Sequence, residues 1–335
     1  MHEALIYEKL SSGGVICGLC PHNCKLSPGN TGICRVRSNL DGHLIAENYG
    51  ILTAIHSDPI EKKPLYHYFP GRKILSIGSI GCNLKCSFCQ NCEISQAGVN
   101  DFPDLRSYTP ENILNMASSD KENLGVAYTY NEPSVFYEFM LDTSMLVNSA
   151  GLKNIVVTNG FINKIPLDHL LKYADAFNID LKAFDDDFFR KYTHSKLSPV
   201  LNSLKQISKS NKHLEITNLV IPGLNDKAGT FREMVKWIAV ELGSHTVLHL
   251  SRYFPKYKSE IESTSLSSLV NLYDIAREFL SYVYVGNVSL SNIQDTRCHS
   301  CNSLLIKRNG YSVELIGINL DGSCMNCHAK ITVVS

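Results

Sequence analysis

The feature that most constrains this chain is a cysteine triplet in the string Gly81-Cys-Asn-Leu-Lys-Cys-Ser-Phe-Cys-Gln90. Cys82, Cys86 and Cys89 follow a C-x3-C-x2-C spacing, and the aromatic residue Phe88 precedes the last cysteine. Three thiolates this close in sequence can ligate three irons of a [4Fe-4S] cluster and leave the fourth iron open. Because an open iron can bind and polarise a small molecule, the motif predicts an enzyme.

Length and charge narrow the class of protein further. The chain has 335 residues, enough for one large α/β domain with small additions. Lysine plus arginine (32) equals aspartate plus glutamate (32), which argues against nucleic acid or an anionic membrane as the main partner. No apolar run approaches the roughly 20 residues that span a bilayer, and residues 1–9 are charged where a signal peptide has its apolar core. We therefore expect a soluble cytoplasmic protein.

The other cysteines form a group near each end of the chain. Tight C-x2-C pairs in a large chain without an export signal indicate metal ligation rather than the disulfides of small secreted proteins. The first group suits structural zinc or an auxiliary iron–sulfur cluster, since thiolate softness does not separate the two. The last group has two C-x2-C pairs 22 residues apart, a zinc-ribbon pattern. The members of the two groups are Cys17, Cys20, Cys24 and Cys34, then Cys298, Cys301, Cys324 and Cys327.

Cys92 belongs to the middle group but stands apart from the triplet. It would complete a C-x3-C-x2-C-x2-C set and close the fourth iron. We expect it on a helix that follows the cysteine loop. Three interpretations stay open at this point: a plain thiol, a reserve ligand and a redox-sensitive thiol.

Short β-branched segments alternate with helical segments through the middle of the chain. This alternation indicates βα units and a parallel sheet, so we predict a partial (β/α)6 barrel, with a weaker seventh strand at residues 283–285. The expected strands are 74–80, 125–129, 154–158, 176–181, 214–221 and 246–251. The expected helices include 134–149, 164–173, 198–209, 228–242 and 265–282.

Three parts of the chain are expected from these patterns. Residues 1–72 form a four-cysteine metal module with a hairpin that turns at Asp41 and Gly42. Residues 73–292 form the core barrel. Residues 293–335 form a small module resembling a zinc ribbon.

Polar residues follow the ends of the predicted strands. Ligands of parallel α/β sheets bind outside the carboxyl ends of the strands. We therefore expect these residues to line one mouth together with the cysteine loop. They include Asn131, Glu132, Asn159, Asp180, Lys182, Asn225, Asp226, Ser251, Arg252 and Tyr253.

The cysteine motif and the strand-end series together resemble the radical S-adenosylmethionine (SAM) enzymes, over about residues 73–290. The resemblance implies that the open iron binds the amino nitrogen and carboxylate of SAM. It also implies that one electron from the cluster breaks the bond between the sulfonium and C5′. The resulting 5′-deoxyadenosyl radical then abstracts a hydrogen atom from substrate, while the protein positions the cofactor and excludes water.

The same resemblance implies roles for single residues. Phe88 lies on the adenine side, and Glu132 stands where the family has a glycine–glycine–glutamate motif, accepting a charge-assisted bond from the methionine ammonium. Asn131 belongs to the same motif. Lys182 pairs with the SAM carboxylate, and Asp180 with its ammonium or the ribose region. For Asn159, a SAM contact and the capping of a strand end stay equally open.

A narrower resemblance covers nearly the whole chain. The segments that carry it are 17–24, 32–37, 58–67 and 69–71, with the two C-terminal cysteine pairs. They look like the AmmeMemoRadiSam-system radical SAM enzyme, a branch related to pyruvate formate-lyase activases. This implies Memo-like and AMMECR-like partners and a reductant such as ferredoxin or flavodoxin, with an unknown substrate. The alternatives are a glycyl-radical enzyme activase and a non-catalytic zinc-ribbon binding protein, which the balanced charge disfavours.

Overall fold

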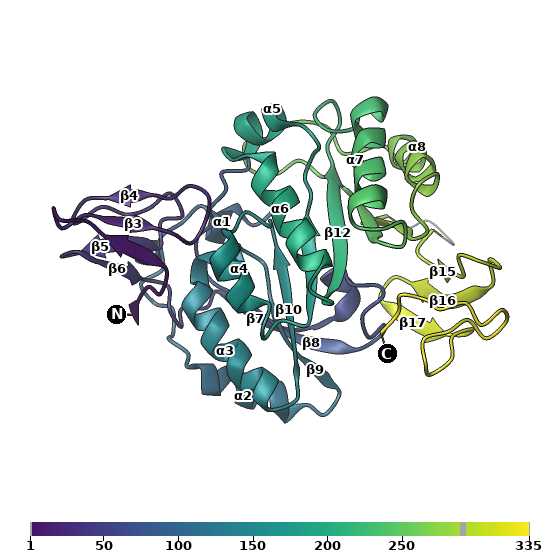
Figure 1. The fold of residues 1–335 in the computed structure, drawn as a ribbon, viewed down its shortest axis with the longest axis horizontal. Coiled ribbons are helices and arrows are strands. Elements are labelled where there is room, and N and C mark those ends of the chain that lie inside the picture. Colours follow the sequence, from purple (N-terminus) through teal and green to yellow (C-terminus); the bar gives the residue numbers. More distant parts are fainter. Residues whose placement is uncertain (1, 289–292, 335) are drawn as a thin grey trace.

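The structure is a computed structural model that describes residues 2–288 and 293–334. Its centre is an eight-stranded sheet in the order β14-β13-β12-β11-β10-β9-β8-β7 (Figure 1). Strands β8 to β14 run parallel, and β7 pairs antiparallel with β8. The bounds are β7 (Ala54–Pro59), β8 (Lys73–Gly78), β9 (Asn123–Tyr128), β10 (Lys153–Thr158), β11 (Ala176–Asp180), β12 (His213–Val220), β13 (Val247–Arg252) and β14 (Val283–Gly286).

Helices connect the parallel strands, as crossovers between parallel strands require. Helix α6 shows why they form: Leu197, Val200, Leu204 and Ile207 recur at helical spacing and are all buried. The sheet between them is apolar, and β9 is buried along its whole length. The helices are α1 (Cys92–Ser95), α2 (Pro110–Ser119), α3 (Tyr137–Ser149), α4 (Lys164–Leu170), α5 (Asp186–Phe188), α6 (Leu197–Ser208), α7 (Ala228–Glu241) and α8 (Leu266–Arg277).

The predicted parallel α/β fold is confirmed, with one strand that we did not expect. The six predicted strands correspond to β8–β13, and the weaker seventh to β14. Strand β7 was not expected, because its sequence Ala-Ile-His-Ser-Asp-Pro lacks a clear apolar pattern. Within the described ranges, β7 and β14 do not pair with one another, so the sheet is open rather than closed into a barrel.

The two ends of the chain form small sheets on opposite sides of the core (Figure 1). The predicted hairpin is present, with Asp41 and Gly42 both at left-handed φ, 48° and 83°, as a tight two-residue turn requires. The strands of the N-terminal sheets are β1 (His2–Glu3), β5 (Arg37–Leu40) and β6 (His43–Ala46), then β2 (Tyr7–Lys9), β3 (Val15–Cys17) and β4 (Lys25–Leu26). The C-terminal strands are β15 (Thr296–Arg297), β16 (Leu304–Asn309) and β17 (Ser312–Leu315).

The division into three domains stays a prediction. Strand β7 lies inside the expected N-terminal part, residues 1–72, yet it belongs to the central sheet. The expected boundary after residue 292 abuts residues 289–292, which lie outside the described part of the chain.

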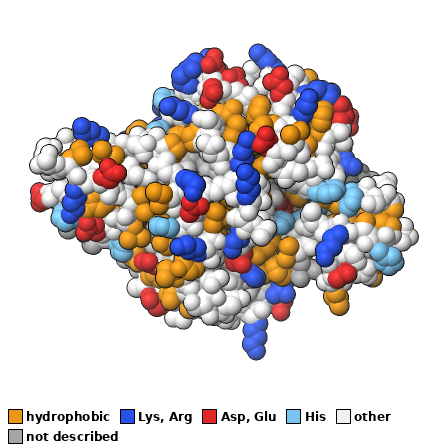
Figure 2. Space-filling model, viewed as in Figure 1, with side chains coloured by type: hydrophobic (Ala, Val, Ile, Leu, Met, Phe, Trp, Pro, Cys, Tyr) orange, Lys and Arg blue, Asp and Glu red, His pale blue; other side chains and the backbone are white. Residues whose placement is uncertain are grey.

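The described surface carries mixed charge. On the face shown in Figure 2, basic and acidic side chains are interspersed, in keeping with the equal totals of 32 and 32. That described face therefore presents no continuous basic stripe of the kind that nucleic acid binding uses. Among the described helices, none is long and apolar enough to cross a membrane.

Candidate active site

A cavity of about 740 Å³ opens at the carboxyl edge of the central sheet. Residues at or just beyond the ends of β8 to β13 contribute to its wall. Its volume lies within the range of small-molecule sites, about 300–1,000 Å³. The structure brings together in this wall all nine residues that the sequence assigned to the cluster and to SAM: Cys82, Cys86, Phe88, Cys89, Asn131, Glu132, Asn159, Asp180 and Lys182.

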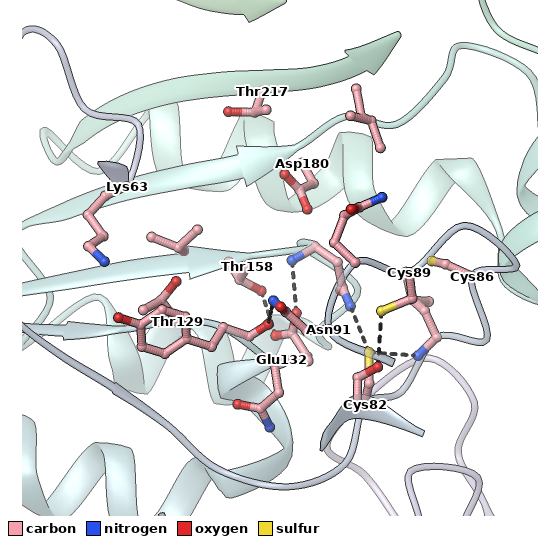
Figure 3. A pocket seen from close by; sticks show the side chains of 18 of the residues that line it. Lys63, Cys82, Cys86, Cys89, Asn91, Thr129, Glu132, Thr158, Asp180 and Thr217 are labelled. Carbon is pink, nitrogen blue, oxygen red and sulfur yellow. Dashed lines mark hydrogen bonds between the residues drawn. The ribbon is translucent and has the colours of Figure 1, made fainter. Parts of the chain in front are cut away.

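The cysteine loop lies between β8 and α1 and occupies one end of the cavity (Figure 3). The Leu84 N–H donates to the Cys82 sulfur at 3.3 Å. Burial raises the pKa of the Cys82 thiol well above its usual range and that of Cys86 to about 12. Such thiols become thiolates when a metal centre supplies the compensating positive charge. The donor set therefore fits an iron–sulfur cluster.

The shape of this loop depends on a glycine and an asparagine. Gly81 has a left-handed φ of 88°, and a Cβ there would lie 2.6 Å from the Cys34 carbonyl oxygen. Asn131 joins the loop to the segment after β9, since its Oδ1 accepts from Ser79 N at 3.0 Å and its Nδ2 donates to the Gly81 carbonyl at 2.9 Å. Asn131 thus lines the cavity while holding the loop in place.

Ser95 is a site residue that the sequence did not reveal. It ends α1, and its hydroxyl lies 3.1 Å from the Cys89 sulfur. A serine six residues after a cysteine is too common a pattern to identify such a contact, which depends on how α1 folds back on the loop.

Glu132 is 2% exposed, and three donors hold it. Its Oε1 accepts from the Thr158 hydroxyl at 2.6 Å and from Ser134 N at 3.0 Å, and its Oε2 accepts from Asn159 N at 2.8 Å. Burial raises the pKa of Glu132, although these donors oppose the shift. With a single donor on Oε2, the carboxylate keeps acceptor capacity for a cation in the cavity.

Asp180 and Lys182 form an ion pair at the end of β11, 2.7 Å between Nζ and Oδ2. Burial alone would lower the pKa of Lys182, but the charge and hydrogen bond of Asp180, together with the nearby Cys86 and Cys82 thiolates, raise that pKa above its ordinary value. The ammonium is therefore a permanent cation inside the cavity wall. Asn159 also faces the cysteines: its Nδ2 lies 3.9 Å from the Cys82 sulfur and donates to Asn83 Oδ1 at 2.8 Å.

The end of the cavity away from the cysteines is formed by a polar cluster that includes Lys63 (Figure 3). Asp58 accepts from Lys63 at 2.7 Å and from the Tyr130 hydroxyl at 2.6 Å. Burial alone would raise the pKa of Asp58, but these donors hold it well below its usual range. The charged composition of segment 58–67 alone is typical of an exposed segment and does not indicate this position.

Four strand-end residues that we expected at the mouth do not line the cavity: Asn225, Asp226, Arg252 and Tyr253. The first three are engaged with backbone groups instead, since Asn225 donates to the Lys182 carbonyl, Asp226 accepts from Gly223 N and Arg252 donates to the Thr264 carbonyl. Tyr128 and Tyr253 are fully buried. The Tyr128 hydroxyl donates to Asn154 Oδ1, and the Tyr253 hydroxyl donates to Ser259 Oγ. His67 is also fully buried. Cys92 begins α1 and is half-buried, and it does not line the cavity with the other three cysteines.

The two terminal cysteine groups differ in spacing. The C-terminal sulfurs all lie within 4.8 Å of one another, with Cys298 to Cys327 at 3.5 Å and Cys301 to Cys324 at 3.7 Å. A tetrahedral zinc with Zn–S bonds of about 2.3 Å separates its sulfurs by about 3.8 Å, so this group can hold a metal ion. The N-terminal cysteines surround a separate cavity of about 20 Å³.

Known proteins resemble the central part of this chain in sequence and in fold. Residues 76–238 match the Radical SAM superfamily. An uncharacterised protein of Methanocaldococcus jannaschii is 39% identical over 100% of both chains. A pyruvate formate-lyase-activating enzyme of Clostridium pasteurianum is 24% identical over 52% of this chain and 75% of its own. The crystal structure of Streptococcus suis SuiB bound to S-adenosylmethionine has a TM-score of 0.50 and 15% identity, covering 62% of this chain and 48% of that one. The chain therefore contains a Radical SAM superfamily domain, which spans residues 76–238.

Proposed function

We propose that Cys82, Cys86 and Cys89 hold the [4Fe-4S] cluster of this radical SAM enzyme, and that the 740 Å³ cavity binds SAM and substrate together. The observation that carries the proposal is the convergence of the cysteine loop and the strand ends on one cavity. When bound, the cluster supplies the electron that cleaves SAM, and the 5′-deoxyadenosyl radical so formed abstracts hydrogen from a substrate of unknown identity.

The residues around the cysteines bind and orient SAM in this proposal. Glu132 accepts from the methionine ammonium, and its three protein donors fix the direction in which its free acceptor site points. Lys182 offers its ammonium to the SAM carboxylate, with Asp180 holding it in place or meeting the ribose. Phe88 forms apolar wall on the adenine side, and Asn159 contacts SAM or keeps the Cys82 loop in position.

The opposite end of the cavity is assigned to the substrate. Asp58, Lys63 and Tyr130 form a hydrogen-bonded cluster there, and Lys62 adds a second ammonium 3.1 Å from Asp58. Two ammonium groups share one carboxylate, so this end carries net positive charge. A substrate with an anionic group is favoured by such a wall.

Finer assignments follow the sequence resemblance. The chain is proposed to be the radical SAM component of the AmmeMemoRadiSam system, with Memo-like and AMMECR-like proteins as partners and ferredoxin or flavodoxin as electron donor. The open sheet is proposed to be the six-repeat partial barrel, and the C-terminal cysteines are proposed to hold zinc because their spacing suits a single ion.

A glycyl-radical enzyme activase is the second candidate. The similarity to pyruvate formate-lyase-activating enzymes supports it, although it covers about half of this chain. An activase would generate a glycyl radical in a partner polypeptide, visible by electron paramagnetic resonance. A small-molecule enzyme would instead consume a metabolite.

The test is release of 5′-deoxyadenosine by the anaerobically purified, reduced protein supplied with SAM. We expect release from the wild type and none from Cys82→Ala, Cys86→Ala or Cys89→Ala. The control is Cys92→Ala, which should retain release. A wild type that binds four irons at the triplet yet releases no 5′-deoxyadenosine would contradict the proposal.

A further inference from the structure

We propose that the N-terminal module holds a second iron–sulfur cluster, ligated by Cys17, Cys20, Cys24 and Cys34, in place of a structural zinc ion. The coordination proposal goes beyond the function assigned above and stands on the N-terminal module alone. The role of this second cluster as an electron relay to the Cys82 site rests on the proposed function.

The space between the four cysteines is the first argument. All four line one cavity of about 20 Å³, which exceeds the roughly 10–15 Å³ that admits one water molecule. In a tetrahedral zinc site every sulfur lies about 2.3 Å from the centre. A centre that close to four sulfur atoms leaves no room for a water-sized sphere. The cavity that the four cysteines line, together with eight other residues, is therefore larger than the space that one zinc ion needs.

The C-terminal group provides a comparison within the same chain. Its four sulfurs all lie within 4.8 Å of one another, at the spacing of a single tetrahedral ion. In the described part of the chain, it is the one group of three or more potential ligands that meets this spacing. The N-terminal set, although fully described, does not meet it. Four thiolates at wider spacing are the ligand set of [2Fe-2S] and [4Fe-4S] clusters.

Arg37 provides an independent indication of a bound anionic group. It is 1% exposed and lines the same cavity, and its Nη atoms donate to Glu138, one of them at 3.1 Å. Its Nε–H has no hydrogen-bond partner. A buried donor without an acceptor costs about 1–3 kcal/mol. A cluster sulfur, thiolate or sulfide, would accept this hydrogen, and hydrogen bonds to sulfur also tune cluster potentials.

The rest of the cavity wall is mainly apolar, with Leu19, Leu26, Ile33 and Val135 among its side chains. An apolar wall keeps water from the sulfides. It also provides the low-polarity surroundings that, with hydrogen bonds, set the potential of an electron carrier.

The N-terminal cavity adjoins the cysteine loop of the active site. Asn83 lines it and directly follows Cys82 in the chain. The backbone carbonyl oxygen of Asn83 lies 2.8 Å from His22 Nε2, and the side-chain Oδ1 of Asn83 accepts from Asn159 Nδ2. The close approach of the Cys34 carbonyl to Gly81 adds a second contact. A one-electron donor of the ferredoxin or flavodoxin class would reduce the N-terminal cluster, and that electron would pass to the Cys82 site with no bond made or broken.

The test is a count of iron, acid-labile sulfide and zinc in the full-length protein, reconstituted anaerobically. A second cluster predicts six or eight irons per chain, for a [2Fe-2S] or [4Fe-4S] centre in addition to the first, with sulfide in matching amount. Four irons per chain with a second equivalent of zinc would overturn the proposal.

A variant separates the two iron sites. The triple variant Cys82→Ala/Cys86→Ala/Cys89→Ala should retain two or four irons with sulfide and give a cluster signal on reduction. Its matched control, Cys298→Ala/Cys301→Ala, should lose zinc and retain all the iron. A folded triple variant without iron would contradict the proposal. If the variant does not fold, the wild-type count decides. Because 5′-deoxyadenosine release is measured separately, a failure of the proposed function is distinguishable from a failure of this inference.

Discussion

Glu132 shows how much one buried residue contributes to the cavity. Its carboxylate accepts from Thr158, the last residue of β10, and from Asn159, which follows it, and still presents an acceptor to the cavity. The sequence identified this residue because it follows a predicted strand and occupies the place of a family motif. The sequence did not indicate its three donors, because two of them lie at the end of β10, which folding brings next to β9, and the third lies in the turn that contains Glu132 itself.

Replacing Glu132 by glutamine tests its charge. A hydrogen bond to a charged group contributes about 1.5–3 kcal/mol, so Glu132→Gln should weaken SAM binding roughly tenfold to a hundredfold. Iron content should not change, because Glu132 is not a ligand. Equilibrium dialysis with labelled SAM measures the effect. Glu93→Gln, at a glutamate whose side chain is 75% exposed, is the control. Equal affinity in wild type and Glu132→Gln would disprove the assignment.

Ser95 makes a second prediction at the residue scale. A hydroxyl beside a cluster thiolate stabilises the reduced, more negative state, so Ser95→Ala should lower the reduction potential of the cluster without loss of iron. A redox titration followed by electron paramagnetic resonance measures the shift. Ser87→Ala, in the same loop, is the matched control. An unchanged potential in Ser95→Ala would show that the contact has no electronic effect.

At the scale of elements, the parallel strands were predictable and the extra strand was not. Apolar, β-branched segments such as β10 lie within a residue or two of their expected bounds, because burial on both faces makes a parallel strand uniformly apolar. Strand β7 carries His56, Ser57 and Asp58, so its pairing with β8 depends on tertiary context. The position of Asp58 and Lys63 in the cavity follows from that unpredicted strand and the turn after it.

Helix α1 determines the role of Cys92. Because Cys92 opens this short helix and does not line the cavity, Cys92→Ala should retain the full iron content and SAM cleavage of the wild type. Iron analysis and 5′-deoxyadenosine release measure both quantities. Loss of about four irons in Cys92→Ala, with the fold intact, would make Cys92 a ligand.

At the scale of the whole molecule, hydrogen bonds join the C-terminal end of the chain to the segment between β7 and β8. Val334 exchanges backbone hydrogen bonds with the segment 67–69, at 2.7 and 2.8 Å. His67 lies between the Thr332 hydroxyl at 2.9 Å and the Tyr284 hydroxyl at 2.6 Å. Such contacts join residues more than two hundred positions apart, so no local sequence pattern predicts them.

His67 makes stability depend on pH. Burial lowers its pKa to about 3, so the folded state keeps the ring neutral while an unfolded histidine takes up a proton near pH 6.5. The unfolded state therefore binds more protons between these values, and the free energy of unfolding falls as pH drops through that window. From pH 7 to 5.5, wild type should lose about 1 kcal/mol more than His67→Gln. Denaturant unfolding at both pH values measures this, and parallel losses would contradict it.

The central claim is that the cysteine loop and the strand ends form one site, in which SAM binds the open iron. Electron–nuclear double resonance of the reduced protein with SAM labelled at its amino nitrogen with ¹⁵N tests this most directly. The account predicts a hyperfine coupling between that nitrogen and the cluster, absent without SAM and weakened in Glu132→Gln. A protein with its full iron content, saturating SAM and no such coupling would contradict it.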